Sequence, residues 1–148
     1  MKLYTIGFTK KNAEAFFGLL QNAGVTILLD TRLNNVSQLA GYTKKDDLEF
    51  FVENILGAKY IHSTNLAPTK QILDDYKNKK ISWEQYEVEY NKLLNERDIK
   101  SYFPKLVDIK KETICLLCSE HKAEKCHRRL LAEYLARSLN ENVEVCHL

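Results

Sequence analysis

The sequence has few of the residues that interrupt regular structure. Only five glycines and two prolines occur among 148 residues, and no segment is repeated or low in complexity. A flexible glycine-rich or proline-rich linker between domains is therefore excluded. A chain of this length can build one compact hydrophobic core, and we expect a single domain over residues 1–148.

Long apolar runs and a strong charge of one sign are also missing. No stretch approaches the roughly 20 apolar residues of a membrane-spanning helix, so we expect no membrane association. The N-terminal stretch MKLYTIGFTKKN has neither a long apolar segment nor a small-residue cleavage site, so we expect no signal peptide and a cytoplasmic location. The formal net charge of +2 is too small to indicate nucleic-acid binding by itself.

Common cofactor signatures are absent, and the four cysteines favour no disulfide framework. There is no G-x-G-x-x-G motif and no P-loop. In a reducing compartment Cys115, Cys118, Cys126 and Cys146 are expected to be free thiols. Cys115 and Cys118 form C-x-x-C within the apolar run TICLLC, where residues three apart on a strand point to opposite faces. We therefore interpret this pair as part of a strand rather than as a metal or redox motif.

Five short apolar runs alternate with helical patterns. The runs cover 2–8, 25–31, 59–63, 113–119 and 143–148, and helical spacing covers 12–24, 44–57, 82–94 and 127–139. Asn12 is the expected N-cap of the first helix and Gly24 its C′ residue, while Ser82 and Gln85 have capping-box spacing. The alternation predicts an α/β fold: a mostly parallel sheet of about five strands with helices on both faces.

The segment 64–112 is too long for one crossover connection, so it predicts a helical insertion after the third strand. We expect two or three helices there, covering one end of the sheet. Trp83, Tyr86 and Tyr90 fall on one helical face of this segment. We expect them in the hydrophobic core rather than at a ligand.

Polar and ionisable side chains gather at the carboxyl ends of the expected strands, the edge where open α/β sheets bind ligands. They are Asp30, Arg32, His62, Cys118, Glu120 and His147, and Gly7 ends the first strand at the same edge. A guanidinium can bind phosphate or carboxylate through paired N–H groups, so Arg32 is a candidate anion ligand. Asp30 would orient it or act as a base. The alternative is an internal ion pair between the two.

Cys126, His127 and Arg128 fall in the expected first turn of the last long helix. Unpaired N–H groups and the helix dipole there favour anions and can lower the pKa of a thiol. Cys126 is therefore a candidate nucleophile or hydrogen-bond donor, Glu120 and His127 candidates for proton transfer, and Arg128 an anion ligand. Alternatively, Cys126 and His127 simply pack against the sheet.

A metal site is a further alternative at the same turn. Cys118, His121, Cys126 and His127 could serve as ligands, but their spacing, C-x-x-H-x-x-x-x-C-H, matches no usual structural zinc site. We expect no metal and no cofactor.

Motifs spread along the whole chain are similar to those of one family. They are TIGF at 5–8, LLDTR at 28–32, Ser37, LLCSE at 116–120, CHRRLLA at 126–132 and the closing HL. In these motifs the chain resembles the DUF488 family of small bacterial and archaeal proteins. The resemblance implies a small α/β domain with a site near the motifs, and no established activity. The positions implied are Gly7, Asp30, Arg32, Ser37, Cys118, Glu120, Cys126, His127 and Arg128.

The chain departs from the family pattern at three positions. Phe8 stands where the family often has histidine, Thr31 where it often has valine, and Asn35 where a proline commonly precedes the serine. The change at Phe8 weakens any mechanism that needs a base there.

Together these observations predict a small enzyme or ligand-binding protein with an anion-recognising pocket. A phosphorylated metabolite or nucleotide is the expected substrate class. Arg32, Arg128, Ser37, Gly7 and Cys118 would bind it. One alternative is a nucleic-acid-associated module using Arg32 and the lysines of YKNKK, which are Lys77, Lys79 and Lys80. The other is a structural protein without a catalytic site.

Overall fold

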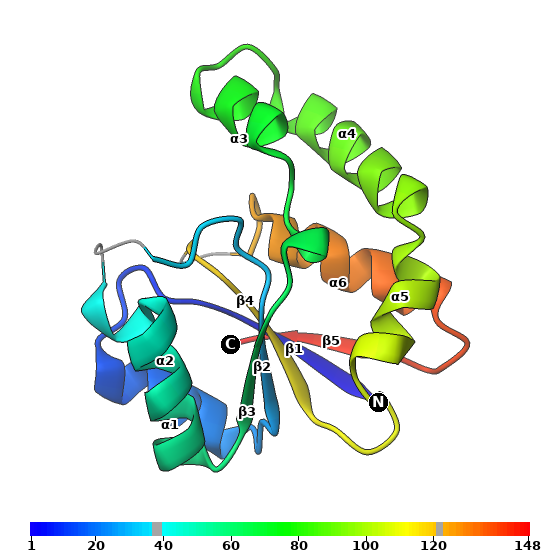
Figure 1. The fold of residues 1–148 in the computed structure, drawn as a ribbon. Helices are drawn as coiled ribbons and strands as arrows, with labels where there is room; N and C mark the ends of the chain where they lie inside the picture. The colour runs from blue at the N-terminus through cyan, green and yellow to red at the C-terminus, as the bar shows by residue number, and fades with distance from the viewer. Residues whose placement is uncertain (37–39, 121–122) are drawn as a thin grey trace.

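The computed structural model describes residues 1–36, 40–120 and 123–148. Within these ranges five strands form one sheet in the order β3-β2-β4-β1-β5, and every pairing is parallel (Figure 1). The strands are β1 Lys2–Gly7, β2 Ile27–Asp30, β3 Lys59–His62, β4 Ile114–Cys118 and β5 Glu144–His147. The predicted α/β class is confirmed, and all strands end at the same edge.

The central strand β4 explains why both faces of the sheet are covered. Its sequence ICLLC is buried at every position. Cys115 and Leu117 belong to one core cluster, whereas Ile114 and Leu116 belong to the other, because successive strand residues point to opposite faces. A continuous apolar run is the pattern expected for a strand that helices cover on both sides.

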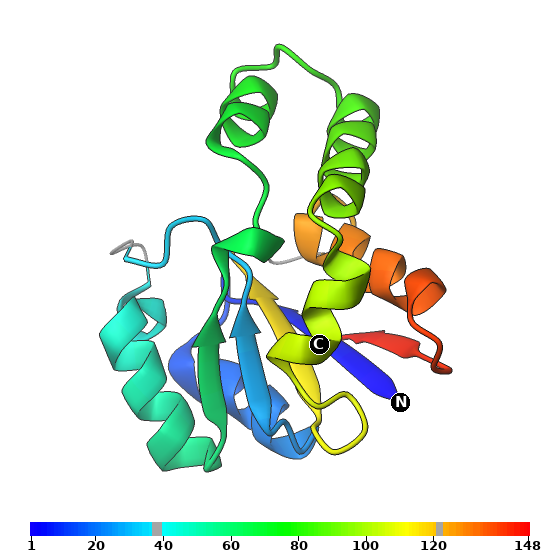
Figure 2. The same ribbon diagram turned by 45° about the vertical axis from the view of Figure 1, so that its right-hand side comes forward.

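Helices cover the two faces as predicted (Figures 1 and 2). On one face lie α1 Ala13–Asn22 and α2 Lys45–Phe51, which continues as a π-helical turn, Val52–Leu56. On the other lie α5 Ile99–Leu106 and α6 His127–Ser138. The expected cap is confirmed, because the Asn12 side chain accepts a hydrogen bond from the Ala15 amide at 2.8 Å.

The insertion after β3, residues 64–112, is described throughout and holds a 3₁₀-helical turn, Thr64–Leu66, followed by three α-helices. They are α3 Lys70–Lys77, α4 Trp83–Glu96 and α5; α3 and α4 project beyond the carboxyl edge of the sheet (Figure 2). The Ser82–Gln85 capping box is present at the start of α4. No helix in the described part of the chain is both long and apolar enough to span a membrane.

The aromatic residues of α4 divide between the core and a partly exposed surface. Tyr86 and Tyr90 are buried, at 3% and 0% exposure, as expected for core residues. Trp83 packs against the same cluster but is only partly buried. It stacks on Tyr86 with ring centroids 4.6 Å apart, which leaves its other side toward the cavity described next.

Candidate functional site

A cavity of about 380 Å³ lies between the carboxyl edge of the sheet and the insertion. The predicted site residues that line it are Arg32, Cys118, Glu120, Cys126 and His127. They come from the ends of β2 and β4 and from the start of α6, as parallel strands would deliver them. The volume falls within the range of about 300–1,000 Å³ typical of small-molecule sites.

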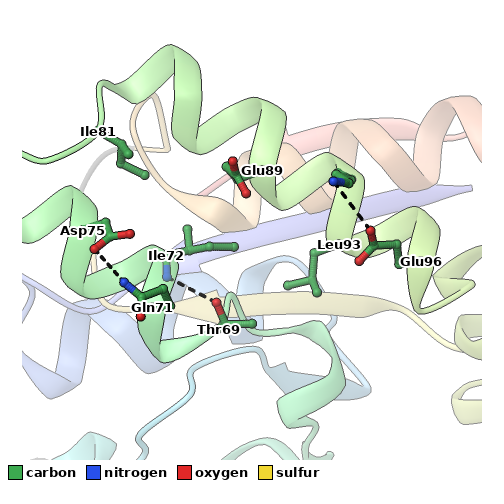
Figure 3. A pocket seen from close by; sticks show the side chains of 9 residues that line it. Thr69, Gln71, Ile72, Asp75, Ile81, Glu89, Leu93 and Glu96 are labelled. Carbon is green, nitrogen blue, oxygen red and sulfur yellow. Dashed lines mark hydrogen bonds and ion pairs between the residues drawn. The ribbon is translucent and has the colours of Figure 1, made fainter.

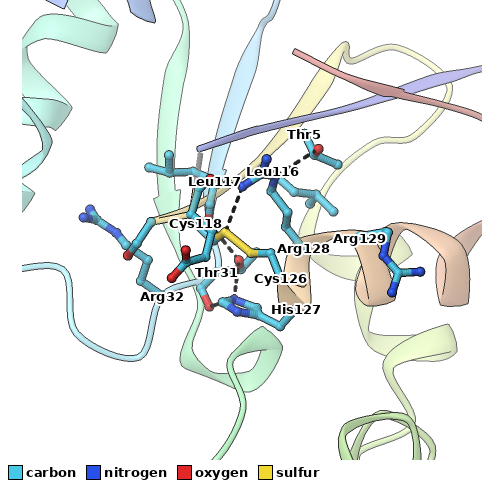
Figure 4. Close-up of a disulfide and its surroundings, with 12 residues drawn as sticks. Thr5, Thr31, Arg32, Leu116, Leu117, Cys118, Cys126, His127, Arg128 and Arg129 are labelled. Atoms are coloured by element: carbon cyan, nitrogen blue, oxygen red, sulfur yellow. Dashed lines mark hydrogen bonds between the residues drawn. A yellow bond between two sulfur atoms is a disulfide. The ribbon is translucent and has the colours of Figure 1, made fainter. Parts of the chain in front are cut away.

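The sulfurs of Cys118 and Cys126 form a disulfide at the floor of this cavity (Figure 4). The expectation of free thiols is therefore wrong for this pair, although Cys115 and Cys146 are free. That expectation was based on a reducing cellular compartment. It did not consider that the start of α6 lies against the end of β4. In this state Cys126 is not a free nucleophile, and that role would require reduction.

Arg128 is almost fully buried, at 1% exposure, and joins three segments. Its Nε donates to Thr5 Oγ1 at 3.2 Å, and its Nη1 donates to Cys118 Sγ at 3.2 Å and to the backbone carbonyl of Glu120. Burial lowers its pKa from the usual arginine value. Arg128 thus lies beneath the disulfide rather than among the cavity-lining side chains.

The absence of a side chain at Gly7 leaves room for the Arg128 guanidinium and the Glu120 carbonyl that it binds. A Cβ atom at Gly7 would collide with the Glu120 carbonyl oxygen and approach Arg128 Nη1 to 2.6 Å. The structure therefore places Gly7 under the segment after β4, away from the cavity lining. A glycine is needed there for close approach of backbone, which is a packing requirement.

Asp30 and Arg32 form the internal ion pair that the sequence left as an alternative. Asp30 is fully buried and accepts from Arg32 Nε at 2.9 Å and from Nη2 at 2.8 Å. Tyr60 donates a further hydrogen bond to the Asp30 carboxylate at 2.6 Å, and Arg32 Nη2 donates to the Thr43 carbonyl at 2.7 Å. Burial, with the Asp30 charge second, raises the pKa of the Tyr60 hydroxyl.

One nitrogen of the Arg32 guanidinium takes no part in these hydrogen bonds. Nη1 is buried and has no hydrogen-bond partner among the described residues. The guanidinium lies over the Phe8 ring at 5.3 Å. Figure 4 shows it directed away from the two sulfurs. Arg32 pairs with Asp30 and the Thr43 carbonyl, whereas Arg128 binds Thr5 and Cys118, so these contacts hold the two guanidinium groups in different surroundings.

His127 completes the floor of the cavity. Its Nε2 lies 3.0 Å from both the carbonyl and the hydroxyl oxygen of Thr31. Because a carbonyl can only accept, Nε2 carries the proton, and Nδ1 keeps a lone pair. Burial lowers the pKa of His127 to about 4, with the nearby Arg128 charge adding to the effect and the Thr31 hydrogen bond opposing it. The imidazole is therefore neutral near pH 7.

The two sulfur atoms and the imidazole form a compact cluster. The ligand atoms of Cys118, Cys126 and His127 all lie within 4.8 Å of one another. The sequence offered these three residues, with His121, as alternative metal ligands, and the structure brings the three together. They meet because Cys118 ends β4 and Cys126 is the N-cap residue of the next helix, α6.

The wall and rim of the cavity come from residues that the sequence did not single out as ligands. Tyr76 lies 5.5 Å from Trp83, ring centre to ring centre, and both line the cavity. Lys70 and Lys125 are exposed and border it too. The ion pair between Arg129 and Glu87, at 2.8 Å, ties α6 to α4. The predicted residues Ser37 and His121 lie outside the described residues.

A second hollow, of about 280 Å³, lies between α3 and α4 (Figure 3). Its polar groups mostly satisfy one another: Gln71 donates to Asp75 at 2.8 Å, and the Thr69 hydroxyl accepts from the Ile72 amide at 3.2 Å. None of the predicted site residues lines it. We therefore take the cavity over the disulfide as the candidate site.

Comparison with known proteins returns one family. The family described as "Domain of unknown function DUF488" matches residues 12–135. Neither the curated proteins nor the solved structures give a match.

Proposed function

Because the chain belongs to the DUF488 family, whose function is unknown, we propose a function from the cavity itself. The protein binds a small ligand that combines a flat ring with an anionic group, as in a nucleotide or a related phosphorylated metabolite. The observation that carries this proposal is the lining of the cavity. An aromatic wall and cationic groups border it, and its floor holds reactive side chains.

The aromatic wall supports the ring of the ligand. Trp83 and Tyr76 are partly buried and line the cavity, while Tyr86 backs Trp83 by stacking. Stacking of a nucleobase on an aromatic side chain contributes about 1–3 kcal/mol. The wall is held by buried neighbours, so little side-chain freedom is lost on binding.

The cations support the anionic group. Lys125 borders the cavity from the segment before α6, and Lys70 borders it from α3. Lys70 pairs with Asp74 at 3.3 Å, but both side chains are well exposed, so this pair is weak and can yield to a stronger anion. Arg32 also borders the cavity, but its guanidinium is paired with Asp30 and lies over Phe8, so the two lysines are the proposed anion ligands.

The floor supports proton transfer during a reaction. The Glu120 carboxylate is exposed and lines the cavity, and His127 presents a neutral imidazole. A carboxylate and an imidazole are common general acid and base groups. Cys126 joins them as a thiol once its bond to Cys118 is reduced.

The test uses Trp83, which is the only tryptophan in the chain. Its fluorescence should change on titration with AMP or ADP, reach saturation at one ligand per chain, and respond less to adenosine or phosphate alone. Lys125→Ala should weaken nucleotide binding about tenfold, the effect of losing one charge-assisted hydrogen bond.

Lys92→Ala is the matched control, because Lys92 borders the other hollow. It should leave the affinity unchanged. The proposal fails if none of the nucleotides and sugar phosphates gives a saturable change, or if the two lysine variants weaken binding equally.

The same titration distinguishes nucleotide binding in the cavity from the alternative of nucleic-acid binding on the surface. Lys77, Lys79 and Lys80 are exposed at the end of α3 and in the turn after it. If they bound a phosphate backbone, oligonucleotides would bind more tightly than mononucleotides, and affinity would fall steeply with added salt. Triple replacement of these lysines by alanine would abolish that binding and spare nucleotide binding in the cavity.

A further inference from the structure

We propose that Cys118, Cys126 and His127 of the reduced protein bind one thiophilic divalent cation, such as Zn²⁺, at the floor of the cavity. This goes beyond the small-ligand proposal and does not depend on it. It also departs from our expectation of no metal, which considered spacing along the chain alone.

The spatial arrangement of the ligand atoms suits such an ion. In a tetrahedral zinc site with bonds of about 2.0–2.3 Å, neighbouring ligand atoms lie about 3.3–3.8 Å apart. The two sulfurs and the imidazole nitrogen already lie within 4.8 Å of one another. Once their bond is reduced, the two sulfurs can move apart to the spacing that a bound ion requires.

The backbone spacing of the two cysteines also suits a longer bridge. Their Cα atoms are 7.6 Å apart, beyond the range of about 4.4–6.8 Å usual for a disulfide. An ion placed between two thiolates lengthens the connection from one S–S bond to two metal–sulfur bonds. The strand end and helix start therefore present these cysteines at a spacing that an ion can fill.

The hydrogen bonds around the three ligand residues resemble those that orient ligands in metal sites. The Thr31 carbonyl accepts from His127 Nε2 at 3.0 Å, and a hydrogen bond to the second ring nitrogen commonly orients a ligating histidine. Arg128 Nη1 donates to Cys118 Sγ at 3.2 Å, which favours thiolate over thiol. The second cysteine, Cys126, is the N-cap residue of α6, where the helix dipole has the same effect.

Three protein ligands leave one tetrahedral position for water or for a ligand. All three residues line the cavity together with Glu120, so a bound ion would border the space proposed for an anionic ligand. Catalytic zinc sites have this composition of three protein ligands and one open position, whereas structural sites are closed.

The disulfide form lacks the two thiols that the ion needs. A phosphine reductant supplies two electrons and becomes a phosphine oxide by taking the oxygen of one water, whose two protons complete the two thiols. The thiols then release their protons as they bind the metal. Only the reduced chain should therefore bind the ion through sulfur.

The experiment uses the full chain, treated with a phosphine and a chelator, and then titrated with Co²⁺ as a spectroscopic substitute for Zn²⁺. We expect one Co²⁺ per chain, with thiolate-to-cobalt charge-transfer bands in the near ultraviolet that Zn²⁺ abolishes by competition. Cys126→Ser should lose most of this absorption. Cys146→Ser, which changes a free cysteine on β5, should retain it.

Absence of charge-transfer bands in the reduced protein would overturn the proposal, as would bands of full intensity in a folded Cys126→Ser protein. If that variant does not fold, the wild-type chain oxidised to the Cys118–Cys126 disulfide decides the matter. Cys115 and Cys146 remain free in it. Loss of the bands on oxidation supports the proposal, and their persistence contradicts it.

Discussion

At the scale of single residues, Gly7 shows how one position can support a site without touching its contents. The glycine ends β1, and the Glu120 carbonyl and the Arg128 guanidinium occupy the space that a Cβ atom at this position would need. Both groups are held there by the hydrogen bond between them. A side chain at Gly7 must therefore displace the segment that carries Glu120 as well as the buried arginine.

We predict that Gly7→Ala lowers the free energy of unfolding by about 1–3 kcal/mol, the usual effect of overpacking a well-packed interior. Urea denaturation measures this change. Gly18→Ala is the matched control, because Gly18 lies inside α1 and a Cβ atom added there would meet no neighbour; this variant should gain about 0.5–1 kcal/mol of stability. Equal stability of the two variants would contradict the close approach at Gly7.

At the scale of elements, α4 supplies the aromatic wall, and local sequence determines where it begins. Ser82 Oγ accepts from the Gln85 amide at 3.2 Å, and the Gln85 side chain accepts from the Ser82 amide at 3.0 Å. Trp83 is the first helical residue after this cap. The position of its ring in the cavity therefore depends on the helix beginning at that residue.

We predict that Ser82→Ala destabilises the protein by about 0.5–2 kcal/mol, as for loss of other N-caps, and speeds hydrogen exchange of amides in the first turn of α4. Exposed Glu89 in the middle of α4 provides the control. Glu89→Ala should change stability by no more than about 0.5 kcal/mol. Unchanged exchange in Ser82→Ala would show that packing alone holds the start of the helix.

At the scale of the whole molecule, buried tyrosines make the fold sensitive to alkali. The pKa values of Tyr60, Tyr86 and Tyr90 are raised, with burial the largest cause in each case. Above a pH of about 10, the ordinary tyrosine pKa, these hydroxyls ionise in the unfolded chain but stay protonated in the folded one. Their contribution to stability is complete below that pH and is lost as the pH rises toward their folded values.

We predict that the free energy of unfolding falls as the pH rises above about 10, by up to about 1.4 kcal/mol per pH unit for each of these tyrosines. Tyr60→Phe should be less stable at pH 8, because Asp30 loses a hydrogen bond, yet should show a shallower decline with pH. Urea denaturation of both proteins between pH 8 and 11 measures this. A parallel decline in the two proteins would exclude Tyr60 as a source of alkaline sensitivity.

The fold class could be predicted because its determinants are local. Continuous apolar runs such as ICLLC, the Asn12 cap and the Ser82 capping box each specify an element within a few residues, and alternation of strands with helices implies parallel pairing. Parallel pairing then requires that Arg32, Cys118 and Glu120 emerge at one edge. The sequence by itself thus determined the architecture and the edge at which a site could form.

Only the tertiary structure decided which of those groups bind one another. Arg32 could equally have met a ligand or Asp30, and the sequence left both open; the packing of Thr43 and Tyr60 around the pair selects Asp30. The meeting of Cys118 with Cys126 likewise depends on how α6 packs against the sheet. Arg128 reaches Thr5 across 123 residues, and the energy of such contacts depends on burial that no short segment specifies.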